Sequence, residues 1–141
     1  MKKHLAKKPI HLGLEGTAII ESQISGMAWY GAYLKRRKKD GKEGRLISMY
    51  SFDESLKSWE MHPHGHEVVI CIEGQMEVIQ ETKSKRTKTL LKAGEYLINK
   101  PGVWHTANVK TRATAIFITA GEGTEHRPRA SLLSHNQKTA T

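Results

Sequence analysis

Residues 59–74 of the chain read WEMHPHGHEVVICIEG. Histidines and a glutamate come directly before a run of apolar residues, which is typical of a strand that is buried on both faces. His62 and His64 share one face of an extended chain, because side chains alternate with a period of two. Glu67 has the other parity, and a β-bulge at Gly65 would turn it to the same face. The stretch therefore predicts imidazole and carboxylate groups that project together from a β-sheet.

A second segment, residues 94–108, reads GEYLINKPGVWHTAN. Its histidine, His105, follows a Pro-Gly turn and is expected to reach the first segment from across the sheet. Neutral imidazoles and a carboxylate suit a divalent transition metal with open coordination positions, such as Fe, Mn, Co, Ni or Zn. In a metal-free alternative the same groups form hydrogen bonds with one another. The predicted metal ligands are His62, His64, Glu67 and His105, and His66 replaces one of them if the bulge lies elsewhere.

Short apolar or alternating runs occupy most of the remaining chain, separated by glycine, aspartate or charged residues. We expect strands and no long helix, at 17–21, 27–34, 45–52, 67–73, 75–81, 85–91, 96–99, 105–109 and 113–120. Glycine-containing turns are expected between several of them, including one at Gly74. Short strands at this spacing are typical of an antiparallel sandwich or barrel, so the expected fold class is all-β.

The two histidine segments resemble the two motifs of the cupin superfamily. Glu67 and Gly74 have the spacing of the first motif, and Gly94, Gly102 and His105 have the spacing of the second. The resemblance covers residues 58–109 and, through the strand pattern, most of 16–120. It implies a single-domain jelly-roll β-barrel that holds a metal inside through the histidine pair and glutamate of the first motif and the histidine of the second. It also implies a homodimer.

The chain departs from the usual first motif, whose spacing would place the two histidines at Met61 and Pro63. It follows instead a variant that reads W-E-x-H-P-x-G-x-E, in which fewer than four protein ligands are expected. Under this resemblance His62, Glu67 and His105 are the principal candidates, His64 comes next, and His66 is held in reserve.

One domain is expected for a chain of 141 residues. We expect residues 1–15 to form an N-terminal arm, residues 16–121 the cupin-like barrel, and residues 122–141 a C-terminal tail. The single cysteine, Cys71, excludes an internal disulfide and cysteine-rich zinc sites. No apolar run approaches the ~18 residues of a membrane span, and the first residues lack the apolar segment of a signal peptide. A cytoplasmic protein without membrane association is therefore expected.

The formal net charge is +9, from 23 lysines and arginines against 14 acidic residues. Much of the excess lies in two clusters, one at residues 35–45 and one at residues 83–88, which we interpret as solvated hairpin tips. Neither cluster contains an aromatic residue that would stack on a base, so no specific nucleic-acid partner is expected.

Three functions are compatible with these features. The first is a metal-dependent enzyme acting on a small molecule, with oxygenase, isomerase or lyase chemistry, because an open coordination position can bind O₂ or polarise a substrate. The second is a non-catalytic cupin that binds or senses a small molecule. The third is a structural or storage protein, which the short length and the histidine-lined motif make the least favoured. The sequence does not specify the substrate, since one fold supports many chemistries.

Overall fold

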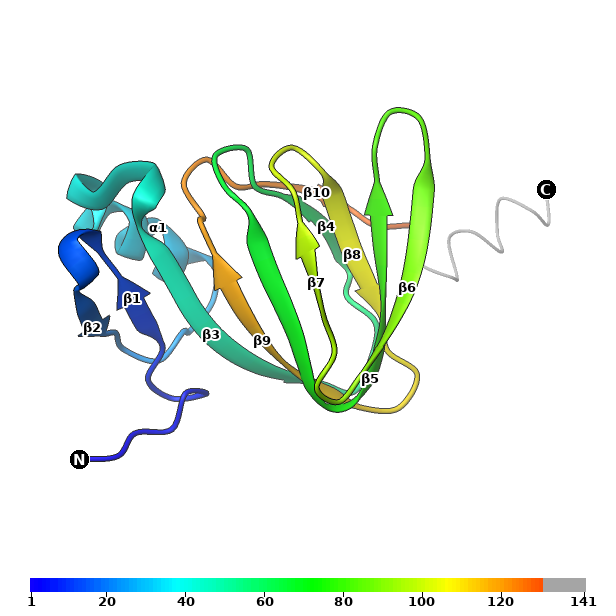
Figure 1. The fold of residues 1–141 in the computed structure, drawn as a ribbon, viewed down its shortest axis with the longest axis horizontal. Coiled ribbons are helices and arrows are strands. Elements are labelled where there is room, and N and C mark those ends of the chain that lie inside the picture. The colour runs from blue at the N-terminus through cyan, green and yellow to red at the C-terminus, as the bar shows by residue number, and fades with distance from the viewer. Residues whose placement is uncertain (131–141) are drawn as a thin grey trace.

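A computed structural model describes residues 1–130, and strands dominate it (Figure 1). One α-helix, α1 (Met27–Arg36), and two short 3-10 segments, Leu14–Gly16 and Lys38–Glu43, lie in the N-terminal third. The strands are β1 (Ile10–Leu12), β2 (Ala18–Ile20), β3 (Arg45–Phe52), β4 (Ser58–Met61), β5 (Glu67–Glu81), β6 (Arg86–Lys92), β7 (Tyr96–Asn99), β8 (Trp104–Asn108), β9 (Ala113–Thr119) and β10 (Glu125–Pro128).

The strands of this region pair antiparallel in the order β10-β4-β8-β5-β9-β3-β1-β2, and β6 and β7 each pair with β5. Because β5 takes part in both halves of this arrangement, the sheet rolls around an interior instead of lying flat. The interior beside β5 is filled by small and medium apolar side chains, among them Val69, Cys71, Met76, Ala113 and Ala115. The predicted all-β jelly-roll is confirmed.

Strand β5 joins the two predicted strands 67–73 and 75–81 into one, so the expected turn at Gly74 is wrong. A bulge between Cys71 and Glu73 shifts its register against β9. Before the bulge odd-numbered residues such as Val69 face the interior, and after it even-numbered residues such as Met76 do so. A bulge adds one residue and thereby reverses which residues, odd- or even-numbered, face the interior. In the sequence this reversal interrupts the alternation and resembles a break between two strands.

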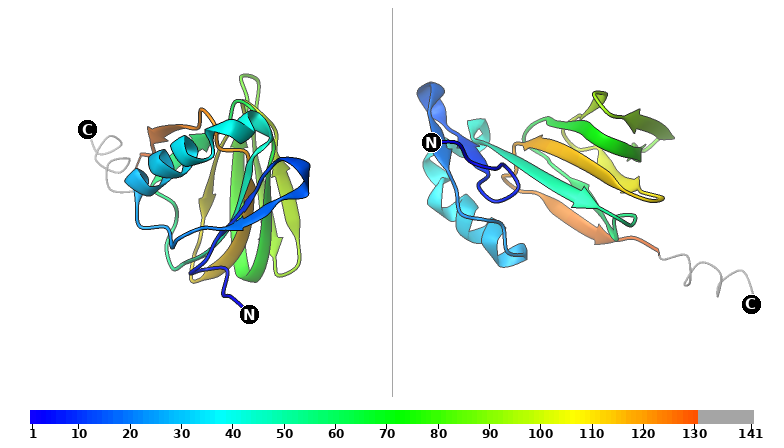
Figure 2. Two further views of the ribbon diagram at one scale, coloured as in Figure 1. Left: turned by 90° about the vertical axis from the view of Figure 1, so that its left-hand side faces the viewer. Right: turned by 90° about the horizontal axis from the view of Figure 1, so that it is seen from below.

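Residues 27–34, predicted as a strand, form most of helix α1 instead. Trp29 and Tyr33 are four residues apart and therefore lie on one face of a helix, where both are buried and their rings stack at 5.3 Å. Figure 2 shows α1 and the first two strands together at one end of the molecule, beside the barrel. Within residues 1–130, no helix has the length and apolar character needed to cross a membrane.

The sheet extends beyond the predicted barrel boundaries at both ends. β1 lies in the expected N-terminal arm and pairs with β2 and β3, and β10 lies in the expected tail and pairs with β4. β1 and β10 are only three and four residues long, and neither shows the alternation by which strands were predicted elsewhere in the chain. Residues 131–141 of the expected tail lie outside the described residues.

Buried polar contacts attach the N-terminal strands to α1. His11 is 1% exposed, and its two ring nitrogens lie 2.6 Å from the Tyr33 hydroxyl and 2.6 Å from an Asp40 carboxylate oxygen. The Glu21 carboxylate accepts hydrogen bonds from Arg36 and Arg37. Tyr33 and Asp40 lie 22 and 29 residues from His11 in the chain, so a local sequence pattern does not reveal these contacts.

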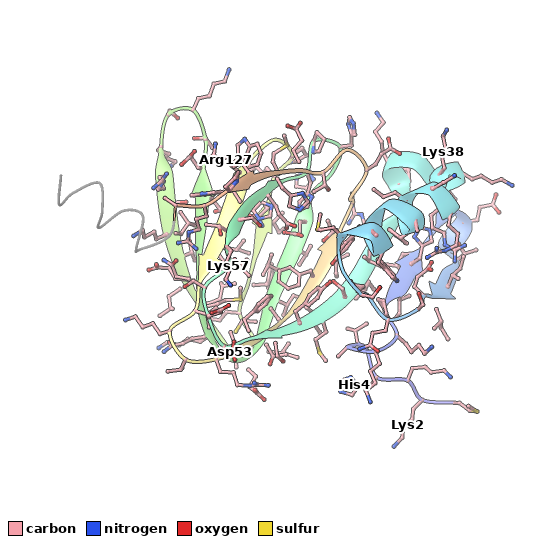
Figure 3. All side chains as sticks on the ribbon, turned by 180° about the vertical axis from the view of Figure 1, so that it is seen from behind. Lys2, His4, Lys38, Asp53, Lys57 and Arg127 are labelled. Carbon is pink, nitrogen blue, oxygen red and sulfur yellow. The ribbon has the colours of Figure 1, made fainter. Side chains whose placement is uncertain are left out.

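One basic cluster matches its predicted position and the other does not. Residues 83–86 surround the tip of the β5–β6 hairpin, as expected. Residues 35–43 instead form the end of α1 and the 3-10 segment after it, and Lys38 lies there at the helical end of the molecule (Figure 3). The prediction of a hairpin at that cluster followed from the false strand at 27–34.

Candidate metal centre

Three of the predicted ligands meet inside the barrel. His62 follows the end of β4, Glu67 begins β5, and His105 lies on β8. Each offers a ligand atom, and these three atoms all lie within 4.8 Å of one another. The exposed fractions of the residues are 4%, 3% and 7%, so water reaches none of them freely.

Neighbouring side chains hold the Glu67 carboxylate in place. Asn99 donates a hydrogen bond of 3.1 Å to Oε1, and the Thr119 hydroxyl donates one of 2.7 Å to Oε2. The Gln80 amide in turn donates to the Asn99 side-chain oxygen at 2.8 Å. Burial raises the pKa of Glu67, but His62, His105 and the Thr119 bond together hold it below its usual value. Glu67 is therefore a fixed, ionised carboxylate at neutral pH.

Hydrogen bonding also determines which nitrogen of His62 carries a proton. Thr124 Oγ1 donates its only proton to the Gly121 carbonyl oxygen at 2.8 Å. His62 Nδ1 lies 2.8 Å from the same hydroxyl, so Nδ1 must be the donor in that contact. The neutral His62 ring consequently has its lone pair on Nε2, the nitrogen that faces Glu67. An outer hydrogen bond of this kind is what orients histidine ligands in metal sites.

The Nε2 atoms of His62 and His105 are buried and make no hydrogen bond to any of residues 1–130. They lie 3.2 Å and 3.6 Å from opposite oxygens of Glu67 without adopting hydrogen-bonding geometry. Buried His11, by contrast, has both nitrogens partnered. Because an unpaired buried polar atom costs stability, two such atoms around one carboxylate suit the binding of a cation between them. The residues present therefore fit a divalent metal.

The pKa values of the two imidazoles are shifted in opposite directions. Burial lowers the pKa of His62, but the adjacent Glu67 carboxylate more than offsets this and the net pKa is raised. Burial dominates at His105, whose pKa is held below its usual value. His105 is thus neutral at neutral pH and already in the form that binds a metal.

The structure does not bring His64 and His66 to this cluster. Both side chains are exposed, in the loop that joins the end of β4 at Met61 to the start of β5 at Glu67. The expected single strand with a bulge at Gly65 is therefore wrong. Gly65 is instead packed so closely that an added Cβ would lie 2.5 Å from the Cβ of Ala120.

Several residues of the site carried no signal in the sequence. Asn99, Thr119 and Thr124 orient the ligands, but each is an isolated polar residue in a strand or turn and resembles any surface residue. The period-two pattern did place Asn99 and Thr119 in expected strands without indicating that they face Glu67. The register of β5 against β7 pairs Glu67 with Asn99, and the register of β5 against β9 pairs Glu67 with Thr119. Only these pairings identify the two residues as partners of Glu67.

A cavity of about 670 Å³ opens from the cluster. His62, Glu67 and His105 line one part of it, and Tyr30 and Leu34 from α1 line another. Its volume lies within the range of roughly 300–1,000 Å³ that is usual for small-molecule sites.

The comparisons with known proteins agree with this arrangement. Residues 53–121 match the family described as "Cupin domain". An oxalate oxidase structure aligns with a TM-score of 0.51 at 20% identity, covering 64% of this chain and 50% of that one. Among curated proteins, none matches the chain.

Two further structures align over shorter stretches. One is an uncharacterised protein from Klebsiella pneumoniae with a double-stranded β-helix domain, at 22% identity and a TM-score of 0.49 over 62% of this chain and 76% of that one. The other is a cupin superfamily protein from Desulfitobacterium hafniense, at 20% identity and a TM-score of 0.46 over 53% and 65%.

Fold and site together define a small β-barrel protein with a histidine- and carboxylate-lined interior. Residues 53–121 form a cupin domain. The family match, the rolled antiparallel sheet and the His-Glu-His cluster converge on the same assignment, and the resemblance expected from the two histidine segments is confirmed.

Proposed function

We propose that this cupin binds one divalent transition metal through His62, Glu67 and His105, and acts with it on a small molecule in the adjoining cavity. The observation that carries the proposal is the pair of unpartnered Nε2 atoms on either side of a fixed carboxylate. Two histidines and one carboxylate with open positions are the ligand set of non-haem Fe(II) oxygenases, so Fe(II) is the first ion to test, ahead of Mn, Co, Ni and Zn. The oxalate oxidase neighbour, an enzyme by its name, supports the fold and leaves the reaction open.

A bound metal would supply a Lewis acid with free coordination positions. The chain's own residues contribute orientation and exclusion of water. Asn99 and Thr119 fix the plane of the Glu67 carboxylate, and Thr124 fixes the tautomer of His62. The low exposure of all three ligand residues keeps competing water away from the cluster, which strengthens every charge interaction within it.

Metal binding to the purified, chelator-treated protein tests the proposal directly. We expect one equivalent of Fe(II), or of spectroscopically visible Co(II), per chain, with an absorption spectrum that changes when a small exogenous ligand is added. A change of this kind reports an open position. Metal content well below one equivalent after reconstitution with all five ions would refute the proposal. Stoichiometric metal with ligand binding but no turnover would favour the non-catalytic sensing function.

We also propose that the outer face of the barrel joins two copies of the chain as a homodimer. Strand register aligns one row of six side chains and a second row of four across this face: Ile98, Val68, Ile118, Ile47, Ile10 and Ile20, and beside them Tyr96, Ile70, Ile116 and Met49. None of the ten is buried, and Ile20, Ile98 and Tyr96 are 55%, 45% and 63% exposed. We call these ten residues the outer apolar face.

A second copy is the partner that this face suits. Six strands span about 24 Å, so the two rows cover on the order of 350–400 Å² of uncharged surface. Specific dimers need about 800 Å² per partner, usually as an apolar centre with a polar rim. The chain has a net charge of +9, so a negatively charged partner would be attracted to the basic clusters and not to this uncharged face. A two-fold axis, by contrast, can place the uncharged face of one copy against the same face of a second copy.

Sedimentation or light scattering at micromolar concentration measures this association. We expect a dimer for the unmodified protein and a monomer for Ile70→Lys, whose charge would lie unpaired at the centre of the interface. Leu90→Lys, a change at an exposed leucine of β6 outside the outer apolar face, is the control and should remain dimeric. A monomeric unmodified protein, or a dimeric Ile70→Lys variant, would contradict the proposal.

A further inference from the structure

Aromatic side chains gather on one wall of the cavity. Tyr50 and Phe52 of β3 and Phe117 of β9 form a three-ring group whose centroids lie 6.0–6.1 Å apart. All three line the cavity together with the aliphatic residues Val69, Met76 and Val78. Rings at these separations and tilts offer both faces and edges, which suits a further aromatic ring better than a flexible chain.

Apart from the imidazoles of the ligand cluster, the described lining residues of the same cavity offer no buried group that could carry a positive charge. Its one lysine, Lys57, has a side chain that is 85% exposed and pairs with Glu54 at 3.3 Å. The lining also contains two carboxylates, Glu60 and Glu67, of which Glu60 contacts His126 at 2.9 Å. A carboxylate on the body of a ligand would therefore lose its hydration without gaining a partner, and the apolar wall would disfavour it.

The polar lining of the cavity outside the ligand cluster includes a pair of tyrosine hydroxyls. Tyr30 of α1 and Tyr50 of β3 meet through their hydroxyls. Burial raises the pKa of both, so both are neutral donors at neutral pH. Two hydroxyls carry two protons and their mutual contact uses one, which leaves one proton to donate to a ligand oxygen. Tyr30 reaches the cavity only because residues 27–36 form a helix.

We propose that the ligand of this cavity has a neutral, planar aromatic body, held among Tyr50, Phe52 and Phe117, with an oxygen substituent directed to the His62–Glu67–His105 cluster. The Tyr30–Tyr50 pair donates its remaining proton to an uncharged oxygen of the same molecule. The inference rests on the proposed function in taking the three-residue cluster as the polar end of the site. It separates this cavity from one built for a small dicarboxylate, which would need a buried cationic side chain in addition to the metal.

Three probes of one size test the proposal in metal-free protein at physiological salt. They are 2-naphthol, which is neutral and aromatic, 2-naphthoate, which is aromatic and anionic, and decahydro-2-naphthol, which is neutral and saturated. We expect calorimetry to show that 2-naphthol binds at least tenfold more tightly than either of the others. If 2-naphthoate bound as tightly as 2-naphthol or more tightly, the proposal that the ligand is neutral would be wrong. If the saturated alcohol bound as tightly as 2-naphthol, the proposal that the ligand is aromatic would be wrong. Absence of binding by all three would overturn the proposal as a whole.

Two cavity variants locate the bound probe. Phe117→Leu keeps the volume near its original value and should weaken 2-naphthol at least tenfold without weakening the saturated alcohol. The double variant Tyr30→Phe/Tyr50→Phe removes both hydroxyls and keeps both rings, and it should weaken the alcohols alone. Leu90→Ala, an exposed site on β6, is the control and should bind as the unmodified protein does. If Phe117→Leu bound 2-naphthol unchanged while its melting temperature was unaltered, the ring would lie elsewhere and the proposal would fail.

The metal-free format separates this inference from the proposed function. Selective 2-naphthol binding by a protein that takes up no metal would refute the metal-dependent function and leave the ligand class standing. If the protein bound one equivalent of metal but showed no preference among the three probes, the proposed aromatic ligand would be refuted and the metal-dependent function would stand.

Discussion

Glu67→Gln is expected to lose stoichiometric metal binding while keeping the fold. The glutamine preserves the size of the side chain, and its one side-chain oxygen can still accept from Asn99 while its amide donates to the Thr119 hydroxyl oxygen. It removes the one negative charge that lies between two unpartnered imidazole nitrogens. Loss of an outer-shell partner alone typically costs 10–100-fold in metal affinity, so loss of this ligand should cost at least ~100-fold. Titration with Co(II), followed by its absorption spectrum, measures the change.

Matched variants make this result specific. Glu77→Gln changes a carboxylate on the same strand that bonds Asn108 outside the cluster, and it should bind metal normally. His105→Ala should lose the metal as Glu67→Gln does. His64→Ala should retain it, because that side chain is exposed in the β4–β5 loop. Full metal content in Glu67→Gln would eliminate the three-residue site, and loss of metal in His64→Ala would restore the fourth predicted ligand.

Gly74→Ala should be among the most destabilising single-methyl additions in the barrel. Gly74 has a φ of +69°, and a Cβ there would lie 2.1 Å from the carbonyl oxygen of Arg112. The left-handed backbone alone costs an alanine about 1–2 kcal/mol, and relieving the clash requires a shift of backbone in β5 or β9. We expect a total loss of ~3 kcal/mol in the free energy of unfolding, or about 10 °C in Tm. Urea and thermal unfolding measure it.

Gly94→Ala isolates the steric part of that loss. Gly94 has a φ of +90° and no atom within 4 Å of an added Cβ, so only the backbone term applies. Its substitution should cost about 1–2 kcal/mol. Equal losses at the two positions would show that the contact with Arg112 contributes nothing and that the bulge tolerates a side chain.

The fold class was predictable because strand periodicity and glycine spacing are local properties of the sequence. The two histidine segments likewise contained His62, Glu67 and His105, which the structure brings together. The failures share one cause. Helix α1, the continuous β5 and the loop between Met61 and Glu67 all depend on contacts with distant residues, which a local pattern does not contain.

The sequence by itself determined an all-β barrel and the residue types of a metal site, since both follow from side-chain chemistry and short-range spacing. Only the tertiary structure decided which histidines face Glu67. Residues 62–66 form a loop, and the parity of an extended chain does not apply to a loop. The structure alone also assigned Thr124 to His62 and aligned Asn99 and Thr119 with Glu67. These partners are 32 to 62 residues apart, and only the register of paired strands and the closing turns bring them into contact.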